Sequence, residues 1–334
     1  MIRMAPSPVV LSVRRLKVHY PLAATWPWRS GGMVKAVEDV HFDLRAGESL
    51  GVVGESGCGK STLARALAGL QPVNGGGIVY QGRDLVRLGE GGWSACRRDI
   101  QMVFQDPQSS LDPGQTVGHA IEEPLEFLRP ELAAGARRDR VQALLEQVGL
   151  APDLADRFPH QLSGGQCQRV AIARALAPSP RILICDEPVS ALDAATQEQI
   201  LELLARLQAE TGMALLFVAH DLGAVQRLCQ RVLVMYLGRI VEQARSEDLF
   251  ARPRHPYTRL LMASAGRLDA DNDGLHDTGE LPNPANPPSG CVFRTRCPMA
   301  DSLCARDIPH LRKAGGSSHA ACHYIEDLQE VAAA

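Results

Sequence analysis

The sequence contains no run of about 18 consecutive apolar residues, the length that a membrane-spanning helix requires. It also lacks an apolar N-terminal segment followed by small residues, which a secretory signal would show. Its 35 basic residues do not outnumber its 38 acidic ones, so it has no excess of positive charge for a nucleic-acid partner. We therefore expect a protein that does not span a membrane, is not secreted and does not bind nucleic acid.

The cysteines do not resemble the framework of a small disulfide-rich domain. There are nine of them, an odd number, in a chain of 334 residues, and no C-x-x-C pair occurs. A reducing compartment fits this usage best. The length predicts one domain of ordinary size with a small appendage.

Residues 54–61, Gly-Glu-Ser-Gly-Cys-Gly-Lys-Ser, match the phosphate-loop pattern G-x-x-x-x-G-K-[ST] at every fixed position. A short apolar strand is predicted before them and a helix after them, which is the context that this motif requires. Such a loop aims consecutive backbone N–H groups at a β-phosphate, at the positive end of a helix. We expect Lys60 to bridge the β- and γ-phosphates and the Ser61 hydroxyl to hold Mg²⁺. Cys58, beside Lys60 at this helix N-terminus, is predicted to favour the thiolate and to be protected from alkylation by ATP.

Polar residues end three of the predicted buried strands. Gln105 ends a strand that begins at Ile100, where its amide could touch a metal ion or water at the nucleotide. Asp186 and Glu187 end the apolar run that starts at Arg181; because neighbouring strand residues point opposite ways, one is expected to orient the Mg²⁺ shell and the other to polarise attacking water. His220 follows the strand 213–219 and is expected to contact the γ-phosphate.

Other segments complete this picture. Residues 9–20 and 35–45 predict an antiparallel sheet, and Tyr20 at the end of the first strand could stack on a purine ring. Residues 116–160 are predicted to be mostly helical.

At 162–166 a second helix N-terminus offers a serine hydroxyl and glycine N–H groups, which have no phosphate to bind unless they face another subunit's ATP. That arrangement predicts a dimer.

An acidic segment near the C-terminus matches the calcium-loop pattern D-x-D-x-D-G-x5-E. Pro282 and Pro284 forbid the usual exit helix, so a solvated linker is the favoured interpretation and Ca²⁺ the alternative. The candidate Ca²⁺ ligands are Asp269, Asp271, Asp273, Asp277 and Glu280.

Four cysteines with the spacing C-x5-C-x6-C-x17-C lie in the last 44 residues, a segment with few large apolar residues. Such a tail cannot bury much core and should need a cross-link or a metal to hold one shape. Zinc and an iron–sulfur cluster both remain open, with the spacing less typical of zinc. The predicted ligands are Cys291, Cys297, Cys304 and Cys322, with His319 and His323 in reserve.

In this order the motifs resemble those of ABC transporter ATPase subunits over nearly the whole chain. The resemblance makes residues 54–61 the Walker A loop, Gln105 the Q-loop, 162–166 the signature, 186–187 the Walker B pair and Asp193 the D-loop. It makes Tyr20 the adenine-stacking aromatic and His220 the switch histidine. The segments 254–258, 279–282 and 286–291 resemble oligopeptide/dipeptide importer ATPases, and residues 57–59 and 188–190 look like those of the second of two paired subunits.

The resemblance implies an α/β P-loop fold: an ABC ATPase core with an antiparallel β subdomain, an inserted helical subdomain at about 106–175, and a small cysteine-containing C-terminal extension. The implied domains are 1–265 and 266–334. The catalytic residues would be Glu187, His220 and Gln105, and Mg²⁺ would be held by Ser61, Gln105 and Asp186. ATP would bind Tyr20, Gly54, Glu55, Ser56, Gly57, Cys58, Gly59, Lys60, Ser61 and Thr62, with Ser163, Gly164, Gly165 and Gln166 contributed in trans.

The implied function is ATP-powered import of di- or oligopeptides, or a related small solute, at the cytoplasmic face of the plasma membrane. The implied partners are a paralogous ATPase subunit, two membrane-spanning permeases and, indirectly, a solute-binding protein outside the cytoplasm. For the four cysteines the resemblance implies a [4Fe–4S] cluster, with Zn²⁺ as the alternative.

Three other classes of protein share some of these features. ABC ATPases of DNA repair or chromosome structure carry long heptad repeats between the phosphate loop and the signature, and none occurs here. Translation-associated ABC proteins normally have two cassettes and a basic linker, whereas this chain has one cassette. A nucleotide-gated redox sensor built on the tail cysteines stays open, and co-purification with membrane permeases would separate it from a transporter subunit.

Overall fold

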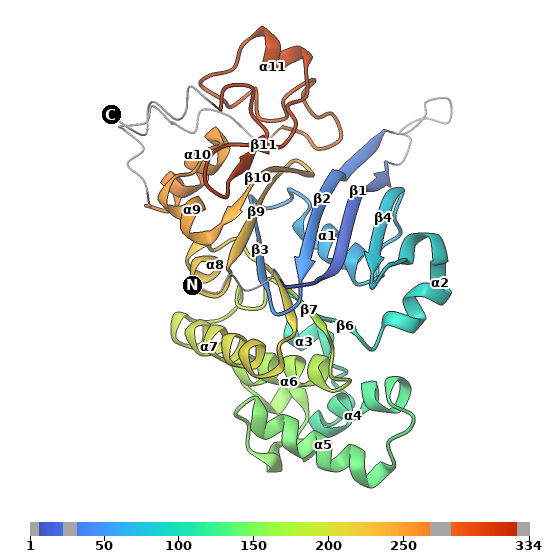
Figure 1. Cartoon of the computed structure of the whole chain (residues 1–334). Coiled ribbons are helices and arrows are strands. Elements are labelled where there is room, and N and C mark those ends of the chain that lie inside the picture. The colour runs from blue at the N-terminus through green and yellow to red at the C-terminus, as the bar shows by residue number, and fades with distance from the viewer. Residues whose placement is uncertain (1–6, 23–31, 268–281, 326–334) are drawn as a thin grey trace, which may run out of the picture.

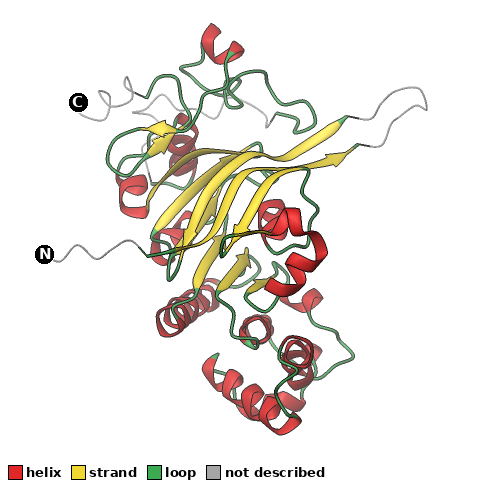
Figure 2. Ribbon diagram, turned by 45° about the vertical axis from the view of Figure 1, so that its right-hand side comes forward, coloured by secondary structure: helices red, strands yellow, loops and turns green. Residues whose placement is uncertain are grey.

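The computed structural model describes residues 7–22, 32–267 and 282–325. The predicted calcium loop, residues 269–280, therefore lies outside the described residues. The described strands form two sheets, and helix α1 (Lys60–Leu67) contacts strands of both (Figures 1 and 2).

The smaller sheet has the strand order β2-β1-β4-β5 and its neighbouring strands are antiparallel. This confirms the antiparallel sheet expected from the alternating apolar residues before the phosphate loop. Its inward side chains, such as Val13, Val18 and Val40, are fully buried. The strands are β1 (Val9–Pro21), β2 (Met33–Arg45), β4 (Gly75–Tyr80) and β5 (Arg83–Asp84).

The larger sheet has the order β11-β12-β10-β9-β3-β8-β7-β6. The five strands from β9 to β6 are parallel, and β10, β12 and β11 add antiparallel pairs at one edge. The buried strands predicted at 181–187 and 213–219 correspond to β7 and β8 of this sheet. The strands are β3 (Ser49–Val53), β6 (Ile100–Val103), β7 (Ile182–Asp186), β8 (Ala214–Val218), β9 (Arg231–Tyr236), β10 (Arg239–Arg245), β11 (Arg312–Lys313) and β12 (His319–Ala320).

Every residue of β3, β7 and β8 is buried, because these strands are covered on both faces. Side chains alternate between two cores. Ile182 and Ile184 of β7 face the core shared with α1 and the smaller sheet, whereas Leu183 and Cys185 face the core shared with the helical part of the chain. The apolar runs in the sequence therefore reflect burial on two sides.

The helices between β6 and β7 pack on one another to form the helical subdomain, green in Figure 1. Its apolar stripe, formed by residues 141, 144, 145 and 148, is buried. In the described part of the chain, no helix has the length and apolarity to cross a bilayer. The remaining helices are α2 (Leu85–Cys96), α3 (Pro107–Ser110), α4 (Val117–Leu128), α5 (Ala134–Gln147), η1 (Pro152–Asp156), η2 (Pro159–Gln161), α6 (Gly164–Leu176), α7 (Ala194–Thr211), α8 (Leu222–Leu228), α9 (Ser246–Ala251), α10 (Pro256–Ser264) and α11 (Ser302–Arg306).

The C-terminal segment is joined to this framework. Strand β12 pairs with β10 through Glu242 and Ala320, and Phe293 is 1% exposed within the main core. The tail thus buries its own apolar residues in the main core, which the expectation of a tail with little core did not foresee.

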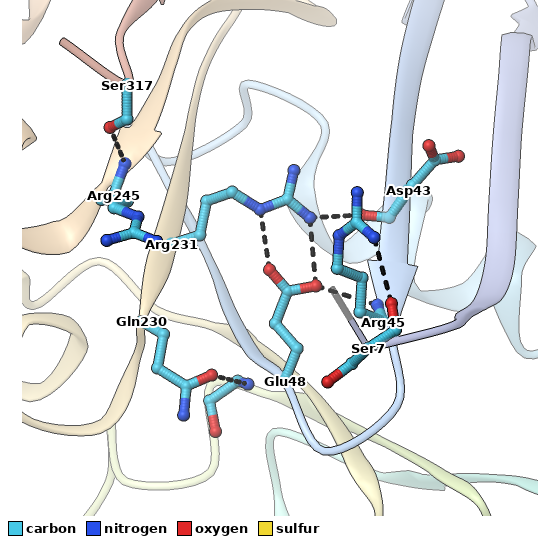
Figure 3. A network of polar contacts seen from close by, with 9 residues as sticks. Ser7, Asp43, Arg45, Glu48, Gln230, Arg231, Arg245 and Ser317 are labelled. Carbon is cyan, nitrogen blue, oxygen red and sulfur yellow. Dashed lines mark hydrogen bonds and ion pairs between the residues drawn. The ribbon is translucent and has the colours of Figure 1, made fainter. Parts of the chain in front are cut away.

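A polar network joins the two sheets where β2 runs into β3 (Figure 3). Arg231 of β9 donates to both carboxylate oxygens of Glu48, at 2.8 and 3.2 Å, and also to the Asp43 carbonyl of β2. Glu48 in turn accepts from the N–H of Arg45 at 2.8 Å. These charge-assisted bonds connect β9 of the larger sheet to the end of β2 and to the turn that leads into β3.

Candidate functional site

The phosphate loop connects β3 to α1, as its motif predicts. It lies tightly between two strands: a Cβ on Gly59 would stand 1.9 Å from the Ala36 carbonyl oxygen of β2, and one on Gly54 2.2 Å from that of Met235 of β9. Both glycines also have positive φ, which other residues rarely adopt. No other residue fits at these positions.

Lys60 begins α1 and is 4% exposed. Its ammonium group donates to the carbonyl oxygens of Gly54 and Glu55, at 2.8 and 3.0 Å. These bonds hold the positive charge inside the loop.

Ser61 and Asp186, two of the predicted Mg²⁺ ligands, are brought together from α1 and β7. The Ser61 hydroxyl donates to Asp186 Oδ1 at 2.9 Å. Burial raises the pKa of Asp186, although the Ser61 hydrogen bond and Arg65 act in the other direction. A hydroxyl and a carboxylate oxygen are the donors that Mg²⁺ prefers, so this pair fits the ion.

Gln105, Glu187 and His220 meet although their elements are far apart in the sequence. The Gln105 amide donates to Glu187 Oε2 at 3.0 Å, and His220 Nδ1 lies 3.5 Å from the same oxygen. Glu187 has a positive φ of 47°, an uncommon conformation for glutamate, and its N–H donates to the Val218 carbonyl. The backbone thus turns this carboxylate away from Asp186 and toward the other two side chains.

Strand β6 ends at Val103, two residues before the predicted end at Gln105. The side chain of Asp106 accepts hydrogen bonds from the N–H groups of Gln108 and Ser109, so a short helix starts there and the chain leaves the sheet early. Gln105 therefore lies on a loop, not at a strand end.

Tyr20 lies at the end of β1, where its hydroxyl is 3.4 Å from Thr62 Oγ1 of α1. The side chain is half-buried beside the phosphate loop. This position leaves a ring next to the loop on which a base could stack.

The signature residues 162–166 start helix α6. Ser163 and Gln166 form a capping box, with the Ser163 hydroxyl accepting from the Gln166 N–H at 3.3 Å. Asp193 likewise caps α7 by accepting from the N–H of Thr196 at 3.0 Å. Within the described residues, no hydrogen bond links Ser163 to the phosphate loop of its own chain.

The prediction of a reactive Cys58 was wrong. The residue is 3% exposed, and burial raises the pKa of its thiol despite the neighbouring Lys60. The helix N-terminus and the nearby charge do not compensate for the loss of water around the sulfur. Cys58 therefore contributes its backbone to the loop and keeps a protonated side chain.

The four tail cysteines line one small cavity together with His255, Phe293 and His323. Burial raises the pKa of Cys291 to about 11 and that of Cys297 to about 12, and the neighbouring thiols add to both shifts. Among the described residues, no three or more His, Cys, Asp or Glu side chains are arranged to hold a metal ion. Of the two reserve histidines, His323 borders this cavity and His319 does not.

Sequence reasoning missed two features. Arg296 and Tyr257, both far from the phosphate loop in the sequence, contact it through Glu55, and no local pattern predicts such a contact. A groove beside Gln105 contains Phe127, which is 77% exposed. The sequence does contain a signal for this groove, because Phe127 falls outside the apolar stripe of α4 that includes Ile121 and Leu125. A large apolar residue at such a position indicates an exposed apolar surface.

Two protein families match the chain. The model described as ABC transporter matches residues 37–190, and the one described as oligopeptide/dipeptide transporter, C-terminal region, matches residues 241–304. The first contains the phosphate loop, the signature and the strand-end carboxylates. The second contains Arg296 and three of the four tail cysteines.

Curated relatives cover nearly the whole chain. The oligopeptide transport ATP-binding protein OppF of Salmonella typhimurium is 48% identical over 96% of this chain and 97% of its own length. The oligopeptide transport ATP-binding protein AppF of Bacillus subtilis is 44% identical over 94% of this chain and 97% of its own length.

Solved structures agree with the fold. A dimeric ATP-binding cassette in a post-hydrolysis state, bound to ADP and phosphate, is 31% identical with a TM-score of 0.63, covering 71% of this chain and 98% of its own. The protein cbiO1 of Clostridium perfringens, part of an ABC transporter complex, is 28% identical with a TM-score of 0.62, covering 78% of this chain and 97% of its own. The chain therefore belongs to the ABC transporter family, as an ATPase of the group with the oligopeptide/dipeptide transporter C-terminal region.

Proposed function

We propose that this chain hydrolyses ATP to power the import of di- or oligopeptides, or a related small solute, as a peripheral subunit at the cytoplasmic face of the plasma membrane. The observation that carries the proposal is the joining of a nucleotide site to an oligopeptide-type C-terminal region in one core. The peptide transport named for the curated relatives supports the class of solute.

Glu187 is the residue we assign to water activation. Its carboxylate is set by Gln105 and His220, so it can accept a proton from a water molecule near the γ-phosphate. His220 would contact the γ-phosphate of bound ATP. Ser61, Asp186 and Gln105 would hold Mg²⁺, which when bound supplies positive charge to the phosphate oxygens.

A second, paralogous ATPase subunit completes the site in our proposal. Ser163, Gly164 and Gly165 stand at the start of the helix α6 and would meet the ATP of the facing subunit, with Gln166 and Asp193 close to that boundary. The dimeric state of the similar cassette supports this arrangement. Closing on ATP and opening after hydrolysis would then drive transport.

A groove of about 460 Å³ beside the Q-loop is the site we assign to a membrane-spanning permease. Leu70, Phe104 and Phe127 border it and are 56%, 37% and 77% exposed. The Glu123–Arg174 ion pair, at 3.0 Å, adds a charged wall. Exposed apolar side chains with a polar margin suit a short amphipathic helix from a permease loop, and the position next to Gln105 would connect it to the nucleotide.

Phe127→Asp tests this function. The tagged chain is co-expressed with the two permease subunits of its transporter and purified. Both permeases should co-purify with it. Phe127→Asp should abolish that recovery, because a charge would be buried against an apolar helix. Leu88→Asp, which changes a 54% exposed residue of α2 away from the groove, is the control and should behave like the unchanged chain. Permeases absent from the wild-type preparation would refute the function, and full recovery with Phe127→Asp would refute the docking site.

For the tail we propose a [4Fe–4S] cluster held by Cys291, Cys297, Cys304 and Cys322, with Zn²⁺ as the alternative. Four thiols line one cavity, which is the number of cysteine ligands that such a cluster uses, although the side chains are not arranged as a formed metal site in the described structure. A bound cation would replace the protons that burial keeps on Cys291 and Cys297. The cluster's role would be structural, within an extension of residues 266–334 that follows an ATPase domain of residues 1–265.

Cys297→Ser tests the metal. Anaerobically purified chain should be brown, with a broad absorption near about 400 nm from sulfur-to-iron charge transfer. Cys297→Ser should bleach it and expose the tail to protease, whereas Cys96→Ser, a buried cysteine of α2, should leave both unchanged. Colourless protein with stoichiometric zinc would reverse the choice of metal. Metal-free protein with an ordered tail would end the proposal.

A further inference from the structure

The C-terminal extension reaches the phosphate loop through an ion pair between Arg296 and Glu55. Arg296 Nη1 lies 3.1 and 2.9 Å from the two carboxylate oxygens of Glu55, the second residue of the loop. The Arg296 side chain is 3% exposed and that of Glu55 22%. Because one nitrogen faces both oxygens at a site with little water, this is a strong charge-assisted contact between the tail and the loop.

The backbone of Glu55 is held as well, by Tyr257. Its N–H donates to the hydroxyl of Tyr257, the second residue of α10, at 2.8 Å. The buried Tyr257 ring packs on Tyr236 of β9 and on Phe293 of the tail, with centroids 4.5 and 5.5 Å apart. The guanidinium of Arg296 lies 5.9 Å from the Tyr236 ring. A single aromatic cluster therefore supports both contacts to Glu55.

Glu55 also contacts the lysine that would bind phosphate. Its carbonyl accepts from Lys60 Nζ at 3.0 Å, so this residue connects Arg296 on one side to Lys60 on the other. A phosphate loop binds well when its N–H groups and lysine are already in place, because little ordering is then lost on binding. Together, Arg296 of the tail and Tyr257 of α10 restrain Glu55, which precedes the first residue of helix α1.

We propose that Arg296 is a positioning residue for nucleotide binding, which fixes the start of the phosphate loop through Glu55. This inference rests on the ATP site of the proposed function. It makes the C-terminal extension a part of the nucleotide site, in addition to any role of its cysteines. Since coupling between two sites is reciprocal, bound ATP should also stabilise the tail.

Arg296→Met removes the charge and keeps much of the volume. With the purified full chain and Mg·ATP, we expect a dissociation constant about ten-fold higher than wild type. Arg296→Lys should restore most of the affinity, because a single nitrogen makes the contact. In the assembled transporter, turnover at saturating ATP should stay close to wild type, since Glu187 and His220 are untouched. ATP should slow proteolysis of the tail in wild type and not in Arg296→Met.

Arg294→Met is the matched control. This neighbouring arginine donates to Ser289 within the tail, at 2.9 Å from Nε to the carbonyl, and should not change ATP affinity when replaced. An equal loss of affinity in Arg294→Met and Arg296→Met would overturn the inference, as would unchanged affinity in Arg296→Met. If Arg296→Met does not fold, Glu55→Gln should show a smaller loss in the same direction, and unchanged affinity there would overturn it too. A wild-type chain that binds no ATP would refute the proposed function instead.

Discussion

Glu187→Gln should leave ATP binding intact and reduce ATP turnover in the assembled transporter by about a hundred-fold or more. The amide keeps the size of the carboxylate and can still accept the hydrogen bond from Gln105, which is 3.0 Å long in the structure. It cannot take up a proton from water. Phosphate release and equilibrium ATP binding, measured on the same preparation, separate the two effects.

Glu202→Gln is the control for that experiment, because Glu202 is an exposed residue of α7 and should give wild-type turnover. Turnover near wild type in Glu187→Gln would remove Glu187 from its assigned role. Loss of binding along with turnover would indicate that the carboxylate supports the fold of the site.

Lys60→Ala should instead act on binding, with a loss of affinity for Mg·ATP of about ten- to a hundred-fold. The substitution removes a charge from a phosphate site and also releases the carbonyls of Gly54 and Glu55, which the ammonium group holds at 2.8 and 3.0 Å. Calorimetric titration of the purified chain measures the change. Lys313→Ala, an exposed lysine of β11, should bind ATP normally, and equal affinity in Lys60→Ala would contradict the assignment.

The fold and most of the site could be predicted because their signals are local. The fixed glycines and Lys60 specify a phosphate loop, and the buried runs at β7 and β8 specify central strands that end at one edge. Carboxyl ends of parallel strands meet, so the meeting of Glu187 and His220 followed from two separate segments.

What could not be predicted depends on contacts between distant parts of the chain. Arg296 and Glu55 carry no pattern that relates them, and their ion pair forms where Phe293 of the tail packs on Tyr257 of α10. The prediction of a thiolate at Cys58 was wrong for a related reason. The sequence shows the nearby Lys60, but it does not show the burial that keeps the thiol protonated. Burial of one side chain is set by the whole fold.

ATP-dependent peptide uptake tests the central claim most directly. The chain would be reconstituted in proteoliposomes with its two permeases, its paired ATPase subunit and a solute-binding protein, and accumulation of a labelled peptide mixture would be followed with and without Mg·ATP. We predict accumulation that requires ATP and is lost with Glu187→Gln in this chain. Two results would contradict the account: ATP hydrolysis by the reconstituted wild-type complex without peptide accumulation, or peptide uptake that Glu187→Gln leaves unchanged.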